Sequence, residues 1–425
     1  MDNNGNQILK KLYVRKMQLI RNLFPFFTQQ NNSVYLDSAA TSLKPNTVIQ
    51  AIRSYYEKYS INSHSEGSNL LAQKVRQTIS QTRQLIAEKI NADPEEIIFL
   101  PSTTYSLNIL ALSLKDYLAK GDKVFLTHLE HSSNCYIWQD IAQKKEAKVD
   151  FLPLSEEFII DINKLENYID KKTKIVSFVH MSNSLGVINP VKEISEKIKE
   201  INPDCLVIID ACQSIAHLPI NVKEWNIDAL VFSGHKVYGP TGIGVLWIKK
   251  EVAKKLPNLL WGGGKKFGPN NSLAEKNEYL PLSRKFEVGT LPLAQIFGLK
   301  AAFEFLNNLD IKEISDYEKK LKNYALDKLK ELEKIIIYNQ RLETVDIVLF
   351  NLKDCHAHDV ADYLGKNNIC VRAGNFCCPY LKELVGMEAA IRISFFIYNT
   401  KEEIDKLVEI LKKIIQEPKL LVLSL

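Results

Sequence analysis

The sequence contains no long apolar run, no Cys-x-x-Cys pair, no block of basic residues and no internal repeat. Without an apolar run of about 20 residues, the chain has no candidate for a membrane-spanning helix. Its formal net charge of +5 is spread along 425 residues, whereas nucleic-acid binders usually gather basic charge on one face. The ordinary content of glycine and proline also excludes the collagen-like and disordered classes. We therefore expect no membrane anchor, no nucleic-acid partner and no metal site.

Cysteine is present seven times, which is an odd number and does not indicate a disulfide framework in a chain of this length. The N-terminal residues 1–11 are polar, and the apolar stretch at 21–27 is too short for the core of a signal peptide. A reducing compartment fits these features better, so we expect a cytoplasmic protein. The apolar C-terminal residues 419–425 are also far too short to span a bilayer.

Short apolar runs alternate with segments of helical periodicity, which predicts an α/β protein with a mostly parallel sheet. Because the runs are apolar throughout, helices should cover both faces of that sheet. We expect strands at 96–100, 123–126, 174–179, 206–209, 229–232, 244–248, 345–350 and 391–396. We expect helices at 74–90, 106–118, 191–200, 358–366 and 401–416, and long helices within 296–336.

The alternation of short apolar runs and helical segments gives way to long helical segments near residue 296, which predicts a large and a small domain. Residues 34–295 are expected to form the large domain and residues 296–425 a smaller α+β domain. The segment 1–33 is expected to pack with the small domain. This division agrees with the usual size of protein domains.

Polar residues of chemical interest follow five of the expected strands. In open α/β sheets, ligands bind just beyond the carboxyl ends of the strands. The polar groups that follow the strands are 102–104, His128 with His131, 180–183, Asp210 with Gln213, and 233–236. Their positions predict a single site at one edge of the sheet.

Lys236 and Asp210 are the most informative pair in this set. A lysine directly after a buried strand is poorly placed as solvated surface charge, and a desolvated amine becomes a usable nucleophile. A carboxylate at the end of an apolar strand needs a partner. Taken singly, Lys236 fits a surface loop and Asp210 fits a helix N-cap. Together they are typical of a pyridoxal-phosphate site, in which lysine forms a Schiff base and the carboxylate holds the ring nitrogen protonated.

Residues 102–104 and His131 add two further candidate contacts. Thr103 and Thr104 lie at an expected strand-to-helix turn, where backbone N–H groups and hydroxyls bind phosphate. Simple N-capping of the helix is the alternative interpretation. His131 has the flat ring and the titration range needed to stack on a cofactor and move protons, although a lone loop histidine has no such role by default.

Five ordered motifs resemble the class V aminotransferase-fold enzymes, and most closely the SUF-type (group II) cysteine desulfurases. The motifs are Asp37-Ser38-Ala39-Ala40-Thr41, Glu130-His131-Ser132-Ser133-Asn134, Ser182-Asn183-Ser184-Leu185-Gly186, Asp210-Ala211-Cys212-Gln213 and 233–242. The similarity runs from about Tyr35 to the end of the chain and includes 286–290, 372–377 and 392–400. It implies a PLP-dependent transferase of fold type I, with a seven-stranded, mostly parallel sheet and a homodimer.

The resemblance also implies a role for each site residue. Lys236 would carry the pyridoxal phosphate, Asp210 would pair with its ring nitrogen, Gln213 would bond its ring hydroxyl and His131 would stack on the ring. Thr103, Thr104, Ser233 and His235 would hold the phosphate, and Thr290 would reach it from a second subunit. Asn183, Arg392, Arg372 and His64 would contact the substrate, L-cysteine; a guanidinium suits bidentate binding of its carboxylate.

Cys377 decides the chemistry that the resemblance implies. In the desulfurases a thiol at this position attacks the sulfur of the substrate, becomes a persulfide and passes the sulfur to an acceptor protein, leaving L-alanine. Such a thiol must be exposed and partly ionised by cationic neighbours. A small buried hydrophobe is the alternative for any single cysteine, and it is the expected role of Cys205 and Cys370, which lie within apolar runs.

Several motifs on the substrate side of the expected site depart from the family pattern. Residues 64–69 and 375–379, the latter with a second thiol at Cys378, differ from the usual motifs, and Tyr105 and Ser132 replace a common glutamate and histidine. A selenocysteine lyase, a C–S lyase, or an aminotransferase or epimerase of the same class is therefore an alternative activity. A non-catalytic protein of the same fold is a third interpretation, which the presence of both Lys236 and Asp210 opposes.

Overall fold

The computed structural model describes residues 17–30, 32–63, 69–262 and 282–422. Its largest sheet has the strand order β2-β8-β7-β6-β5-β3-β4, which confirms the expected α/β fold with a seven-stranded sheet. Strand β8 runs antiparallel to both of its neighbours, and the other six strands point the same way. The strands are β2 (Ile97–Leu100), β3 (Lys123–Leu126), β4 (Lys148–Phe151), β5 (Thr173–Val179), β6 (Leu206–Asp210), β7 (Ala229–Ser233) and β8 (Gly244–Ile248).

Strand β4 is the member of this sheet that the apolar runs did not indicate. It pairs only with β3, at the edge of the sheet, and its residues alternate between exposed and half-buried. An edge strand with one solvated face does not need a continuous apolar run. The criterion that finds buried central strands therefore misses it.

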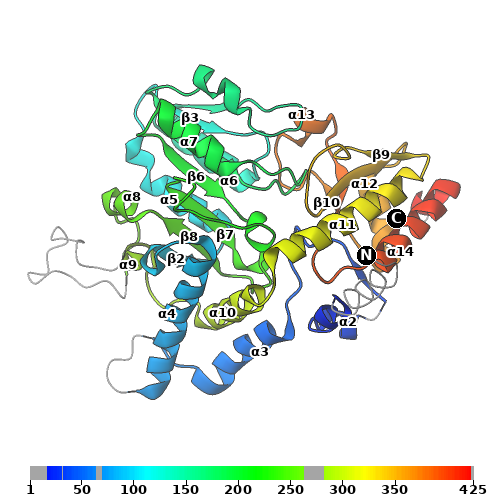
Figure 1. Cartoon of the computed structure of the whole chain (residues 1–425), viewed down its shortest axis with the longest axis horizontal. Helices are drawn as coiled ribbons and strands as arrows, with labels where there is room; N and C mark the ends of the chain where they lie inside the picture. Colours follow the sequence, from blue (N-terminus) through cyan, green and yellow to red (C-terminus); the bar gives the residue numbers. More distant parts are fainter. Residues whose placement is uncertain (1–16, 31, 64–68, 263–281, 423–425) are drawn as a thin grey trace, which may run out of the picture.

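Neighbouring residues of the central strands point into two different cores, one on each face of the sheet. Phe99, Val176 and Phe232 share a core with α3 (Asn46–Ser54), α4 (Leu70–Ile90), α7 (Val191–Ile201) and α10 (Leu293–Asn307). Ile98, Ile175 and Val231 share the other with α5 (Thr103–Ser113) and α6 (Ser132–Lys144). Helices thus cover both faces, which explains why these strands are apolar throughout (Figure 1).

A second, antiparallel sheet has the order β12-β13-β10-β9. Its strands are β9 (Ile335–Ile337), β10 (Ile347–Leu352), β12 (Arg372–Gly374) and β13 (Ala390–Ser394), and a short parallel pair joins β1 (Val34–Tyr35) to β11 (Ile369–Cys370). Helices α11 (Ile311–Lys330), α12 (Ala357–Lys366) and α14 (Lys401–Gln416) complete its core. The shorter helices are α2 (Phe26–Gln29), α8 (Lys250–Lys255), α9 (Ser283–Phe286), α13 (Leu381–Val385) and α15 (Lys419–Val422), and Leu421 of α15 packs into this core.

Helix α11 extends from the side of the large sheet to the second sheet (Figure 1). Helix α10 crosses the expected boundary at residue 296, and its buried side chains belong to the core of the large sheet. Near the N-terminus, Phe24 packs edge-on against Tyr398, and Arg21 pairs with Glu403 of α14. The division into domains at residues 33 and 295 stays a prediction.

A buried charge cluster joins the large sheet, α11 and the second sheet. His217, which follows β6, lies 2.6 Å from Glu318 of α11 through Nδ1 and 3.5 Å from Asp346 through Nε2, and all three side chains are fully buried. Burial lowers the pKa of His217, but the two carboxylates outweigh it and raise that pKa to about 9. The cluster therefore holds a charged imidazolium at neutral pH.

We expect His217 to make the stability of this protein depend on pH. Its pKa in the folded state is raised above the unfolded value of about 6.5, so its contribution is complete below pH 6.5 and is lost as the pH rises towards 9. Urea unfolding of the wild type at pH 6 to 9 should show a loss on the order of 2–3 kcal/mol. The loss should be smaller in the His217→Asn variant, whose remaining pH dependence comes from buried Glu318. The variant should also be less stable at pH 6, because two buried carboxylates lose their cation. His358→Asn, at an exposed position of α12, is the control, and an unchanged slope in His217→Asn would contradict the assignment.

Candidate active site

A cavity of about 220 Å³ lies where the carboxyl ends of β2, β3, β5, β6 and β7 meet the second sheet. Polar residues that follow five different strands line it, as the sequence predicted. From the predicted set, the lining includes Thr103, Thr104, His131, Asn183, Asp210, Gln213, Ser233, His235, Lys236, Arg372, Cys377 and Arg392. Among the described residues, the structure thus brings together all of the predicted site residues except Thr290.

Two predicted residues are not placed in the cavity. Thr290 is exposed, lies outside the lining of this cavity and accepts a hydrogen bond of 3.4 Å from Asn62 Nδ2. His64 lies outside the described residues.

Asp210 and Lys236 lie at the carboxyl ends of two neighbouring strands of the large sheet. Asp210 is the last residue of β6 and pairs in register with Val231 of β7, and Lys236 ends the turn of 3-10 helix that follows β7. Asp210 is 3% exposed and accepts a hydrogen bond of 2.9 Å from the Cys212 N–H. Burial raises the pKa of Asp210, while that hydrogen bond and the charge of Lys236 act in the opposite direction. The helix N-cap alternative does not hold, since the short helix after β6 is preceded by Gln213.

The start of α5 places the hydroxyls of Thr103 and Thr104 at one end of the cavity. Ser102 caps α5 by accepting from the Tyr105 N–H, which leaves the hydroxyls of Thr103 and Thr104 for other partners. Thr103 N–H donates to Ser233 Oγ at 2.8 Å, and Thr104 Oγ1 lies 2.7 Å from Ser133 Oγ. The expected helix at 106–118 therefore begins earlier, at Thr103, because Ser102 supplies the cap.

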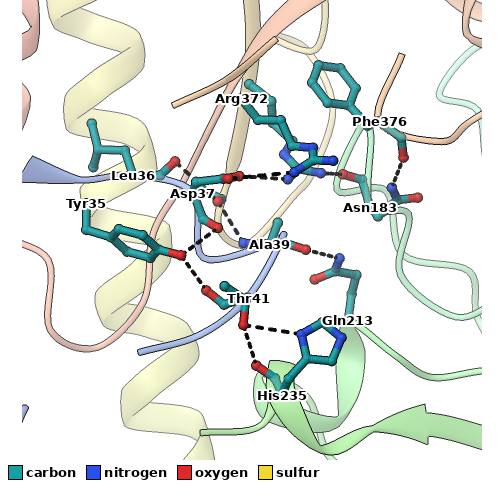
Figure 2. Close-up of polar contacts among 12 residues, drawn as sticks. Tyr35, Leu36, Asp37, Ala39, Thr41, Asn183, Gln213, His235, Arg372 and Phe376 are labelled. Carbon is teal, nitrogen blue, oxygen red and sulfur yellow. Dashed lines mark hydrogen bonds and ion pairs between the residues drawn. The ribbon is translucent and has the colours of Figure 1, made fainter. Parts of the chain in front are cut away.

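His131 and His235 are both neutral at pH 7. His131 caps α6 through Nδ1, which accepts from the Ser133 N–H at 3.2 Å. Burial lowers the pKa of His131 to about 4, and the charges of Lys236, Arg372 and Arg392 act in the same direction. Burial likewise lowers the pKa of His235 to about 4, helped by the nearby lysines, and its Nδ1 lies 3.2 Å from Thr41 Oγ1 (Figure 2).

Two further ionisable residues lie beside these histidines without a role assigned from the sequence: Glu130, which directly precedes His131, and Lys44, which contacts His235. Glu130 is fully buried and accepts from Thr127 Oγ1, Asn134 Nδ2 and the Val179 N–H, and burial raises its pKa to about 8. Lys44 donates to the carbonyl oxygen of His235 at 2.9 Å, and burial lowers its pKa to about 8. A lysine directly before Pro45 offers no sign of this contact, which forms across the fold.

Two arginines of the second sheet close the other end of the cavity. Arg392 is 2% exposed; its Nη1 donates to Asn183 O at 2.6 Å and its Nη2 to Asp37 Oδ1 at 3.1 Å. Arg372 is 45% exposed, and its Nη1 lies 4.0 Å from Asp37 Oδ2 (Figure 2). The backbone of the same N-terminal segment also reaches Gln213, whose Nε2 donates to Ala39 O at 2.8 Å.

The loop after β12 presents Cys377 to the cavity. Phe376 and Cys377 both have positive φ angles, 58° and 55°, which non-glycine residues rarely adopt. Asn183 Nδ2 donates to Phe376 O at 2.7 Å, the Ser132 N–H donates to Cys377 O at 2.7 Å, and Asn375 Oδ1 accepts from the Cys377 N–H. Backbone strain of this kind is typical of functional sites and persists only where surrounding contacts hold it.

The structure distinguishes the two adjacent thiols. Cys377 is exposed and lines the cavity, whereas Cys378 is buried and its Sγ donates to His128 O at 3.4 Å. Burial raises the pKa of Cys378 to about 11. Of the two cysteines expected to be buried, Cys205 is buried, but Cys370 is exposed because it lies on a two-residue strand paired only with β1. The prediction for Cys370 was wrong.

The fold and this arrangement agree with known proteins. The family described as Aminotransferase class-V matches residues 34–407. The chain belongs to the class-V aminotransferase family. This family depends on pyridoxal phosphate, so the family and the cofactor expected from the motifs are confirmed, while the SUF-type subgroup stays a prediction.

Relatives within the family cover almost the whole chain. A probable cysteine desulfurase of Halalkalibacterium halodurans is 41% identical over 399 residues, which span 93% of this chain and 97% of that protein. A probable cysteine desulfurase of Ureaplasma parvum serovar 3 is 39% identical over 394 residues, with coverage of 92% and 96%. The apo structure of a cysteine desulfurase from Thermococcus onnurineus NA1 has a TM-score of 0.85 and 33% identity, and the match covers 93% of this chain and 97% of that one.

Within the described ranges, no group of three or more His, Cys, Asp or Glu side chains is arranged to hold a metal ion. None of the helices in the described part of the chain combines the length and apolar character that a bilayer crossing requires.

We expect the two adjacent thiols to differ in reactivity. Brief exposure to iodoacetamide at pH 8 should label Cys377 at least tenfold faster than Cys378, because burial both raises the pKa of Cys378 and blocks access to it. Fragment-ion mass spectrometry of the peptide that carries both cysteines measures the rates, and labelling of exposed Cys370 is the internal control. Equal labelling of Cys377 and Cys378 in the folded protein would show that the loop does not keep Cys377 exposed and Cys378 buried.

Proposed function

We propose that this protein is a cysteine desulfurase, which converts L-cysteine to L-alanine and carries the sulfur as a persulfide on Cys377. The observation that carries the proposal is the placement of an exposed thiol in one cavity with a lysine amine, a buried carboxylate and two arginines. The names of the relatives, which span nearly the whole chain, support the same activity.

The donor set of the cavity fits pyridoxal phosphate. Lys236 offers the amine and Asp210 a carboxylate for the ring nitrogen, and the N-terminus of α5 with the Thr103 and Thr104 hydroxyls would hold a phosphate. Gln213, Ser233, His235 and His131 line the same cavity. When bound, this cofactor supplies an electron sink that makes removal of the substrate Cα proton feasible.

The substrate end of the cavity fits an amino acid carboxylate. Arg392 Nε and Asn183 Oδ1 are buried without a hydrogen-bond partner among the described residues, and both side chains line the cavity. A buried polar atom without a partner is costly, and such an atom in a cavity is typical of a binding site. Arg392, Arg372 and Asn183 would hold the carboxylate and leave the side chain of the substrate to face Cys377.

Lys236, His131 and Cys377 each have a separate role in the proposed reaction. The Lys236 amine takes the proton from Cα, and neutral His131 exchanges a proton with the substrate thiol. The Cys377 thiolate attacks the substrate sulfur, so that an S–S bond forms and the Cβ–S bond breaks. Protonation of the carbon yields L-alanine, and the sulfur of the persulfide passes to a thiol of an acceptor protein.

We expect Cys377→Ala to reduce alanine formation from L-cysteine at least a hundredfold in the presence of a thiol acceptor, because no other exposed thiol of the described residues lines the cavity. Cys378→Ala, the matched control, should retain activity within about threefold. Alanine, pyruvate and sulfide are measured together, and intact mass locates the added sulfur. Full alanine release by Cys377→Ala contradicts the assignment of the nucleophile, and pyruvate with sulfide in the wild type indicates the C–S lyase alternative instead.

We also propose that the protein acts as a homodimer in the cytoplasm. Thr290 lies outside the cavity of its own subunit, which fits a role at the cavity of a second one. All seven cysteines are free, which fits a reducing compartment.

Sedimentation of the holoenzyme should therefore give a dimer, and Thr290→Val should weaken binding of pyridoxal phosphate roughly tenfold through loss of a hydrogen bond to a charged group. Equilibrium dialysis of the cofactor is the measurement, with exposed Thr28→Val as the control. A monomer, or unchanged cofactor affinity in a dimer, would remove Thr290 from the site.

A further inference from the structure

The two arginines of the candidate site lie directly opposite each other on neighbouring strands. Arg372 of β12 and Arg392 of β13 are partners in the antiparallel register, so both side chains point to the same face of the second sheet. Like charges at such positions repel each other. A counter-charge is therefore needed to hold both guanidinium groups at one end of the cavity.

Asp37 supplies that counter-charge from behind the arginines. Its Oδ1 lies 3.1 Å from Arg392 Nη2 and its Oδ2 lies 4.0 Å from Arg372 Nη1, so that each oxygen faces a different arginine. Asp37 does not line the cavity, although both arginines do. Its backbone is fixed by a β-bridge to Ser394, two residues beyond Arg392 on the same strand.

Arg392 has further contacts that do not depend on Asp37. Its Nη1 donates to Asn183 O, and its guanidinium carbon lies 5.0 Å from the centre of the Phe376 ring. Removal of the Asp37 charge should therefore change the electrostatics of the site more than the position of Arg392.

We propose that Asp37 is a specificity-determining residue that sets the net charge of the carboxylate-binding end to +1, so that the enzyme favours amino acids with a single carboxylate. Two arginines and one aspartate leave one positive charge, which one α-carboxylate neutralises. The second carboxylate of a dicarboxylic amino acid then finds no positive charge left to neutralise, because Asp37 already pairs with the two arginines. This inference rests on the proposed function, since it assumes that the arginines bind the carboxylate of the substrate.

The test compares two non-reacting probes on the holoenzyme, L-alanine with one carboxylate and L-aspartate with two. The dissociation constant of each is measured from the change in absorbance of the bound cofactor. For charges about 8 Å apart at an intermediate dielectric constant, Asp37→Asn should shift the affinity ratio towards L-aspartate about fivefold. Arg372→Gln, at a half-exposed position that tolerates substitution, should shift the ratio about fivefold in the opposite direction.

Two controls separate charge from structure. Asp37→Glu retains the charge and should keep the wild-type ratio. Asp228→Asn removes a buried carboxylate that pairs with Lys199 just before β7, at the end of the sheet away from the cavity, and should also leave the ratio unchanged. A merely structural role of Asp37 would lower the affinity for both probes equally.

The proposal is overturned if Asp37→Asn keeps the wild-type ratio, or, should that variant not fold, if Arg372→Gln does. Failure of the proposed function has a different signature: the wild-type holoenzyme would then release no alanine from L-cysteine, whatever the ratio of the two probes.

Discussion

The pairing of β6 with β7 is the constraint on which the rest of the site depends. Because Asp210 and Val231 are in register, the carboxylate at the end of β6 and the turn that carries Lys236 leave the sheet at the same edge. Parallel strands direct their carboxyl ends to one side, so β2, β3 and β5 add their polar ends to the same place. The rigid sheet thus positions groups that lie more than 100 residues apart in the sequence.

Burial and charged neighbours together determine the protonation of the groups at the carboxyl ends of these strands and of nearby His217. His131 and His235 are neutral at pH 7 because they are partly buried beside cations. Burial raises the pKa of Asp210, and the Cys212 N–H and the charge of Lys236 oppose that rise. His217 is more deeply buried than either His131 or His235 but faces two carboxylates, and its pKa moves in the opposite direction. The neighbours of each histidine, rather than burial alone, therefore decide whether it is charged.

The second sheet completes the cavity and contributes two arginines whose charges Asp37 partly neutralises. Arg372 and Arg392 converge on Asp37, which belongs to the N-terminal segment, while Asn183 from the large sheet contacts both Arg392 and the loop of Cys377. A change in any one of these segments therefore affects the placement of the others. The left-handed pair Phe376 and Cys377 is held by contacts from the loops that follow β3 and β5, which explains how a strained loop keeps its thiol in the cavity.

Sequence patterns alone determined the central strands, the helix 401–416 and the convergence of polar residues on one edge, because burial on both faces leaves continuous apolar runs and parallel strands share a direction. They missed the half-exposed strand β4 and misjudged Cys370, since solvation at an edge depends on neighbours that are distant in the sequence. The tertiary structure alone decided between Cys377 and Cys378, which are adjacent and chemically identical until one is buried. It alone gave Asp37 its role, because an ion pair across more than 300 residues exists only once the chain has folded.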